Sequence, residues 1–262
     1  MSSDWNHLWE TYAASAEANP AQAYRRQLVM QLLALGGGDP GQVRILDLGS
    51  GQGDFARDLS VCFPQAEIRG LDLSTAGVRM AREKVPQGRF LEADLTGPLD
   101  LPEGWAGWAT HMVCTELLEH LEDPAAALAN ARVLLAPGAR IVITVPSGPM
   151  SAFDRFLGHV RHFTRESLGA CILAGGLKPV SVRRAGFPFF NLYRLVVILR
   201  GNRLVQDVAQ AQEGVPSRLA AMTMDLFKIL FRFNALEWGP GWQLVAMAEA
   251  PLLTPPSAGE AP

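Results

Sequence analysis

Three glycines at alternate positions, Gly49, Gly51 and Gly53, follow an apolar stretch that ends at Leu48. Glycine has no Cβ, so the backbone can turn sharply here and approach a ligand closely. A helix is expected after the turn, and the free N–H groups at its N-terminus point back at whatever the turn holds. Ser50 belongs to the same loop. The spacing therefore predicts a nucleotide-binding loop.

A carboxylate at the end of the next predicted strand supports a nucleoside ligand. Asp72 stands 19 residues after Gly53, where it can accept both hydroxyls of a ribose. The dinucleotide fingerprint G-x-G-x-x-G fails from Gly49, because Asp54 occupies its last glycine position. A start at Gly51 gives the tolerated variant ending in alanine, so the glycines alone do not exclude NAD.

Asp47, at the end of the first predicted strand, separates these alternatives. A carboxylate there suits a positively charged ligand, such as the α-ammonium group of S-adenosylmethionine, whereas a pyrophosphate would be repelled. Asp47 either contacts that ammonium directly or orients the glycine turn through backbone N–H groups.

Three histidines are candidates for catalysis. His159 and His162, in Gly-His-Val-Arg-His-Phe-Thr, follow the fifth predicted strand and could take a proton from an acceptor. His120 is either a base or a hydrogen-bonding partner of its own loop, and the structural role is favoured. The His-x-x-His spacing also resembles a metal site, but the loop is irregular and no third ligand stands at a fixed spacing, so we predict no metal.

Alternating strands and helices must position these residues. We expect strands at 43–48, 67–71, 89–91, 109–114, 140–145, 177–184 and 242–250. We expect helices at about 53–63, 75–84, 124–135 and 165–174, the last capped by Thr164, and a turn at Pro137-Gly138. The alternation predicts βαβ units and a parallel sheet covered on both faces.

Five motifs in a fixed order resemble those of class I S-adenosylmethionine-dependent methyltransferases. They are DLGSGQGD, GLDLS, EADLT, CTELLEHLEDP and LAPGARIVITVPSG, and they span residues 43–148. The resemblance implies an α/β, doubly wound, Rossmann-like seven-stranded sheet that is mostly parallel with an antiparallel last strand. It also implies S-adenosyl-L-methionine as cofactor and S-adenosyl-L-homocysteine as product.

The resemblance further assigns residues to the cofactor. Asp72 would bind the ribose hydroxyls and Asp94 the adenine amino group, with Leu73 and Leu95 lining the adenine pocket. The alternative for both acids is a turn or cap role at a strand end. Thr115 falls at the carboxyl end of the fourth strand, where ligands of open α/β sheets bind.

The N-terminal segment is predicted to form one or two helices, broken near Asn19-Pro20. Trp5, Trp9 and Tyr12 recur on one helical face, which forms either a lid over the methyl donor or a face packed on the domain. We include Tyr12 in the cofactor site, together with Arg25, which could reach the methionine carboxylate.

The chain is divided by composition and by the expected elements. We predict an N-terminal helical lid over 1–41 and a cofactor-binding domain over 42–185 and 238–252. Between the sixth and seventh strands lie more than 50 residues, far more than a hairpin loop, so 186–237 is predicted to be a helical cap insertion. The tail 253–262 is predicted to be disordered.

Composition and net charge argue against several classes of protein. The 262 residues carry a net charge of −3, which does not suggest a general nucleic-acid binder. Three scattered cysteines argue against a disulfide framework and favour a reducing cytoplasm, and we see neither a signal peptide nor an apolar run long enough to span a membrane. Arginines and aromatic residues alternate within 167–206, where no acid occurs.

We expect a cytoplasmic enzyme that methylates an O or N atom of a small organic acceptor, in a biosynthetic, secondary-metabolite pathway. The basic stretch favours an acidic or aromatic acceptor, and a homodimer is left open. One alternative is a C- or O-methyltransferase acting on a membrane-associated quinone or lipid-like acceptor. The other is a non-catalytic nucleoside-binding regulatory protein.

Overall fold

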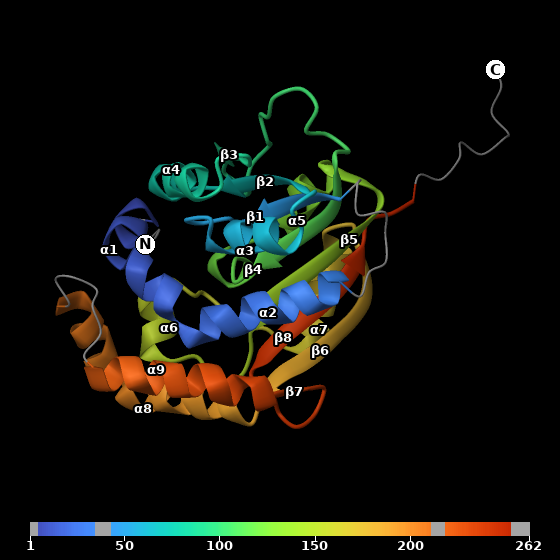
Figure 1. Ribbon diagram of the computed structural model, residues 1–262. Helices are drawn as coiled ribbons and strands as arrows, with labels where there is room; N and C mark the ends of the chain where they lie inside the picture. The colour runs from blue at the N-terminus through green and yellow to red at the C-terminus, as the bar shows by residue number, and fades with distance from the viewer. Residues whose placement is uncertain (1–4, 35–42, 211–217, 253–262) are drawn as a thin grey trace, which may run out of the picture.

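Eight strands form one sheet in the computed structural model, which describes residues 5–34, 43–210 and 218–252 (Figure 1). The strands are β1 (Arg44–Leu48), β2 (Glu67–Asp72), β3 (Arg89–Glu92), β4 (Ala109–Thr115), β5 (Leu135–Pro146), β6 (Lys178–Phe187), β7 (Ala235–Leu236) and β8 (Gln243–Glu249). Their order is β3-β2-β1-β4-β5-β8-β6-β7. Strands β1 to β5 pair in parallel, and β8 runs antiparallel to both β5 and β6.

The predicted mostly parallel, doubly wound sheet with an antiparallel last long strand is therefore confirmed. The eighth strand, β7, has two residues and pairs with the end of β6. Two residues are too few to produce a period-two pattern, so sequence analysis counted seven strands.

The turn predicted at Pro137-Gly138 lies inside β5. Ala109 pairs with Leu135, but His111 pairs with Arg140, so residues 136–139 bulge out of the ladder. Gly138 has a φ of 72°, which a bulge of this kind accommodates without strain.

Alternate residues along the central strands enter two separate apolar cores, because successive strand side chains point to opposite faces. Leu46, Met112 and Ile141 belong to one core, which α5 (Pro124–Arg132) and α7 (Arg165–Ala174) cover. Ile45 and Val113 belong to the other. That second face is covered by α2 (Pro20–Ala34), α3 (Asp54–Cys62) and α4 (Thr75–Lys84).

Local capping residues define the helix starts near the site. The Ser74 side chain accepts the N–H of Gly77 at the start of α4, and Asp123 accepts that of Ala126 at the start of α5. Thr164 caps α7 as predicted. Two short elements, η2 (Leu118–His120) and α6 (Ala152–Phe156), were not predicted.

The C-terminal helices α8 (Phe189–Gln210) and α9 (Arg218–Leu230) lie side by side beneath the sheet, and η3 (Phe231–Phe233) follows α9 (Figure 1). Phe190, Phe227 and Phe231 pack with Ala21 and Tyr24 of α2. This aromatic cluster joins the two helices to the rest of the fold.

The N-terminal helices differ in their packing. The chain does break at Asn19, between α1 (Trp5–Ala18) and α2. Helix α2 buries Leu28, Val29 and Leu32 in the core, so only α1 is placed to act as a lid. The proposed boundaries of the lid, domain and cap remain predictions, and the tail 253–262 lies outside the described residues. Among the described helices none is both long and apolar enough to cross a membrane.

Candidate active site

The glycine turn connects β1 to α3 at the carboxyl end of the sheet. Gly49, Gly51 and Gly53 have φ values of 76°, 49° and 80°, in the left-handed region that favours glycine. The N–H of Gly49 donates to the carbonyl of Leu71 at 2.8 Å, which ties the turn to β2. A Cβ at Gly53 would lie 2.6 Å from the Cα of Ala81 in α4. Glycine is therefore required by the turn and by helix packing, in addition to any close approach of a ligand.

Asp72 at the end of β2 holds the turn. Its Oδ2 accepts the backbone N–H of Gly51 at 2.8 Å, and its Oδ1 accepts that of Ser74 at 2.9 Å. Burial raises the pKa of this carboxyl, and the two hydrogen bonds act against that shift. A carboxylate has about four lone-pair positions. Asp72 can thus order the loop and still accept ribose hydroxyls, so the cap role and the predicted ligand role are compatible.

Asp47 has no such partners. It is 1% exposed, and neither carboxylate oxygen has a hydrogen-bond partner among the described residues. Burial, and secondarily the charge of Asp72, raises the pKa of Asp47 to about 7. The hydroxyl of Ser50 in the neighbouring turn is also buried, and it has no hydrogen-bond partner in the part of the chain that the structure describes. A buried, unpaired carboxylate is costly and favours either a proton or a bound cation.

Helix α1 lies over the glycine turn. A Cβ at Gly51 would be 2.6 Å from the Cζ2 atom of Trp9, so the indole rests directly on this residue. Oδ1 of Asn6 accepts the hydroxyl of Ser74 at 2.8 Å, and the ring of Trp5 meets that of His120 edge-on at 4.7 Å. These contacts pack α1 on the domain over the glycine turn, so both interpretations of the N-terminal aromatic residues are compatible with the structure. The side chain of Tyr12 lies outside what the structure describes.

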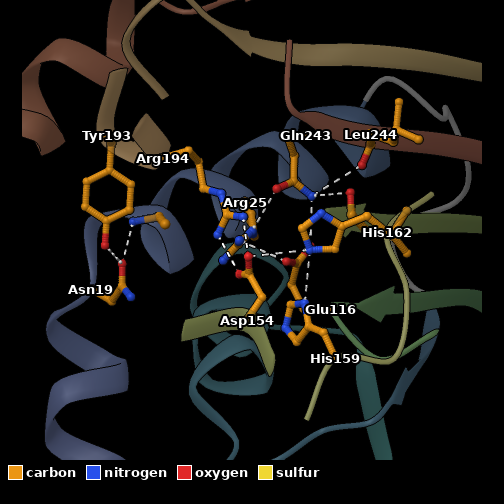
Figure 2. Close-up of polar contacts among 12 residues, drawn as sticks. Asn19, Arg25, Glu116, Asp154, His159, His162, Tyr193, Arg194, Gln243 and Leu244 are labelled. Atoms are coloured by element: carbon orange, nitrogen blue, oxygen red, sulfur yellow. Dashed lines mark hydrogen bonds and ion pairs between the residues drawn. The ribbon is translucent and has the colours of Figure 1, made fainter. Parts of the chain in front are cut away.

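Arg25 is held by residues of the sheet (Figure 2). Its Nε donates to Oε1 of Gln243 at 3.0 Å, and its Nη2 lies 2.9 Å from Oε2 of Glu116. Gln243 in turn donates from Nε2 to Oε1 of Glu116 at 2.8 Å. Glu116 has a φ of 53° directly after Thr115, which is half-buried at the end of β4. To bind the cofactor as predicted, Arg25 must therefore either keep its ion pair with Glu116 while contacting the methionine carboxylate or give up that ion pair.

The residues assigned to the adenine pocket differ in solvent exposure. Leu73 is 52% exposed beside Asp72, whereas Leu95 is 5% exposed and packs in the core. Asp94 is exposed, and its Oδ1 accepts both the N–H and the hydroxyl of Thr96, which lowers the pKa of the carboxyl. The structure thus shows the turn role of Asp94, and its contact with adenine stays a prediction.

The three histidines lie close together in the segments that follow β4 and β5. The rings of His120 and His159 are 4.7 Å apart, and Nδ1 of His159 lies 3.4 Å from Nε2 of His162. Nδ1 of His162 faces the carbonyl of Gly148 at 3.0 Å. Burial lowers the pKa of His120 to about 4, and burial and His120 together lower that of His159. Both imidazoles are neutral at pH 7 and are weak bases.

Three charged residues beside the histidines were missed by sequence reasoning. Asp154 in α6 forms a bidentate ion pair with Arg194 of α8 (Figure 2). Nη1 and Nη2 of Arg194 donate to Oδ1 and Oδ2 of Asp154, each at 2.7 Å. Glu119 is fully buried, and neither of its carboxylate oxygens has a partner among the described residues. The adjacency of Glu119 to His120 was a usable signal, and Arg194 lies in the basic stretch 167–206 that favoured an acidic acceptor, whereas nothing in the sequence marked Asp154.

The residues present fit S-adenosylmethionine. The unpartnered carboxylate of Asp47 matches its ammonium group, the spare lone pairs of Asp72 match its ribose, and the glycine turn admits close approach. Fold and loop together are those of class I S-adenosylmethionine-dependent methyltransferases.

Comparison with known sequences supports this class. The methyltransferase-domain family matches residues 21–182, and the chain belongs to that family. It is 28% identical over 149 residues to the trans-aconitate 2-methyltransferase of Variovorax paradoxus, covering 55% of this chain and 50% of that protein. It is 28% identical over 116 residues to the ubiquinone biosynthesis O-methyltransferase of Xanthomonas axonopodis pv. citri, covering 44% and 48%. The chain spans about half the length of these curated relatives.

Solved structures agree on the fold. A methyltransferase of Thermotoga maritima described as S-adenosylmethionine-dependent matches with a TM-score of 0.57 at 16% identity, covering 94% of this chain and 99% of that one. Phosphoethanolamine N-methyltransferase 2 of Haemonchus contortus, in complex with S-adenosyl-L-methionine, matches with a TM-score of 0.53 at 17% identity, covering 85% and 52%. At these identities the likeness concerns the fold alone.

Proposed function

We propose that this protein transfers the methyl group of S-adenosylmethionine to an O or N atom of a small organic acceptor in a biosynthetic pathway. One observation carries the proposal. Helix α1 contacts both halves of the site, through Trp9 on Gly51 and through Trp5 on His120. The glycine turn and the histidines are therefore contacted by the same helix, which supports one site that serves donor and acceptor together.

Each half has a separate task. When bound, the cofactor supplies a methyl group whose leaving group is a neutral thioether. Asp47 and Asp72 hold and orient the donor, and α1 excludes water from it. His120 and His159 are neutral, so a ring nitrogen can accept a hydrogen bond from the O–H or N–H of an acceptor. Their low basicity makes alignment of the two reactants the main contribution to the rate.

An acceptor screen tests the proposal. The protein is incubated with S-adenosylmethionine and separate pools of phenols, hydroxy acids, carboxylates and amines, and release of S-adenosylhomocysteine is measured. Turnover with a hydroxyl, carboxylate or amine pool is expected. Tight cofactor binding without turnover in any pool would instead support a non-catalytic nucleoside-binding protein.

An exposed apolar surface favours a second candidate, an acceptor of the quinone or lipid type. Along α8, exposed side chains recur at helical spacing at Leu192, Leu195, Val196 and Leu199, the last 76% exposed. Along α9 and η3, a second stripe comprises Met222, Leu226, Ile229 and Phe233. Exposed apolar stripes of this kind suit contact with a membrane surface, from which an apolar acceptor would be taken.

Sedimentation with vesicles separates the two candidates. We expect the second candidate to bind vesicles containing anionic lipid at low salt and to lose binding in the Leu199→Glu/Met222→Glu variant. Exposed Val61→Glu, on α3, is the matched control. Absence of binding at low salt would remove the membrane-associated acceptor and leave the first candidate.

A further inference from the structure

Five residues from two distant segments form a compact group beside the site. We define the histidine–carboxylate cluster as Glu119, His120, Asp154, His159 and His162. Ligand atoms of Glu119, His120 and His159 all lie within 4.8 Å of one another, and so do those of Asp154, His159 and His162. The backbone N–H of Val160 donates to the carbonyl of Glu119 and joins the two segments, and the N–H of His159 donates to the carbonyl of Asp154 within the second segment.

The carboxylate of Glu119 forms no ion pair among the described residues, and the charge of Arg25 acts on it only from a distance. Both of its oxygens are buried and unpartnered among the described residues, and Nδ1 of His120 is buried and unpartnered as well. The neighbouring carboxylates differ, because Glu116 is paired with Arg25 and Asp154 with Arg194. Buried charges in proteins are normally paired or bound to a metal ion. A bound cation would pair with Glu119 and would be within reach of the ring nitrogens of His120 and His159.

We propose that Glu119, His120 and His159 bind a divalent first-row transition-metal ion. Two imidazole nitrogens and one carboxylate oxygen suit Zn²⁺, Fe²⁺, Mn²⁺ or Co²⁺ better than Mg²⁺ or Ca²⁺, which prefer oxygen alone. Three protein ligands leave further coordination positions open, as in catalytic rather than structural metal sites.

The remaining two residues orient the ligands. His162 lies 3.4 Å from Nδ1 of His159, and it is anchored by the carbonyl of Gly148. Asp154 lies 3.7 Å from Nε2 of His162 and is fixed by Arg194. A hydrogen bond from outside the coordination shell, as between His162 and His159, sets the ring orientation of a metal-binding histidine, and the carboxylate of Asp154 lies near His162 without a hydrogen bond to it. We predicted no metal from the sequence because His-x-x-His had no third ligand at a fixed spacing, but the fold brings Glu119 and His120 of η2 close to His159.

The location suggests what the open positions bind. The cluster lies at the carboxyl ends of β4 and β5, and Trp5 of the lid packs on His120. If the proposed methyl transfer is correct, an acceptor oxygen can occupy an open position, where its pKa is lowered. With the ion bound, this coordination replaces the hydrogen bond to His120 or His159, because the ion takes the ring lone pair. Metal binding itself does not depend on that function.

Binding of Co²⁺ to the metal-free full-length protein tests the site. We expect one Co²⁺ per chain by calorimetry, visible absorption bands from nitrogen and oxygen ligands, and a rise in melting temperature. Glu119→Gln and His159→Gln should each weaken binding by at least about tenfold. His162→Gln should still bind one ion with an altered absorption spectrum. His111→Gln, at the opposite end of β4, is the matched control and should match the wild type.

Two results would overturn the assignment. One is the absence of stoichiometric Co²⁺ binding by the wild type, and the other is equal affinity in Glu119→Gln, His159→Gln and the control. If a variant fails to fold, the site can be tested by NMR of the wild-type protein with Co²⁺ bound. We expect shifted proton signals from two imidazole rings. Their absence would exclude the site. None of these measurements uses methyl transfer, so failure here and failure of the proposed function are distinguishable.

Discussion

The carboxylate of Asp72 accepts the backbone N–H of Gly51 over 2.8 Å, joining the tip of β2 to the middle of the glycine turn. The other oxygen takes the N–H of Ser74, which caps α4. One side chain therefore orders both the turn after β1 and the helix after β2. This relationship makes the cofactor loop depend on the same residue that is expected to bind the ribose.

Replacing Asp72 should weaken the cofactor site strongly. Asp72→Ala removes the expected acceptor of the ribose hydroxyls and releases two backbone N–H groups, so we expect more than about a tenfold loss of S-adenosylmethionine affinity by calorimetry. Asp100→Ala, an exposed acid between β3 and β4, is the control. An affinity unaltered in Asp72→Ala would refute the ribose assignment.

Asp47 should make the stability of the cofactor-free protein depend on pH. Its pKa is about 7 in the folded state, against an ordinary value of 3.8. At a pH between these two pKa values, the folded state binds the proton of Asp47 more tightly than the unfolded state does. The free energy of unfolding should therefore fall as pH rises, by up to about 1.4 kcal/mol per pH unit, and level off above pH 7.

Urea unfolding of the wild type and of Asp47→Asn from pH 5 to 8 measures this dependence. We expect the difference in unfolding free energy between them to change with pH through this window in favour of the variant. A constant difference would show that Asp47 is already ionised and paired.

The effect of the contact between Gly51 and Trp9 on stability can be measured by comparing substitutions at Gly51 and at a second glycine. Gly51→Ala should lose stability from its positive φ, about 1–2 kcal/mol, and in addition from the clash with the indole. Gly104→Ala is the control, because Gly104 has a φ of 79° but nothing within 4 Å of an added Cβ. The excess loss should disappear when both glycine variants are compared in a Trp9→Ala background. Equal losses in the wild-type background would argue against α1 resting on the turn.

Arg25 and Glu116 should show strong energetic coupling. Their side chains are 10% and 11% exposed, so Arg25→Met leaves a nearly buried carboxylate and should cost about 3–5 kcal/mol of stability. The double variant Arg25→Met/Glu116→Gln should recover a large part of that loss in denaturant unfolding. Additive losses would mean that the pair is not a unit and that Arg25 is available to the cofactor.

Metal removal should separate turnover from cofactor binding. If the histidine–carboxylate cluster holds an ion that binds the acceptor, a chelator should lower turnover while leaving S-adenosylmethionine affinity unchanged, and added Co²⁺ or Mn²⁺ should restore it. Full turnover after verified metal removal would show that the ion takes no part in the reaction.

Much of the fold followed from local patterns. The strands predicted at 43–48 and 67–71 match β1 and β2 to within a residue, and Thr164 predicted the start of α7. Elements without a repeating pattern escaped prediction. Helix α6 has five residues and β7 has two, and the bulge near Gly138 keeps β5 continuous across an apparent turn signal.

The sequence by itself determined the glycine turn and the carboxylates at the strand ends, because a turn and a strand terminus depend on neighbouring residues and on side-chain periodicity. Only the tertiary structure decided which distant side chains meet. Arg25 reaches Gln243 across 218 positions, and Glu119 meets His159 only because β4 and β5 end at the same edge. Such contacts depend on how whole strands pair and helices pack, and no local pattern records them.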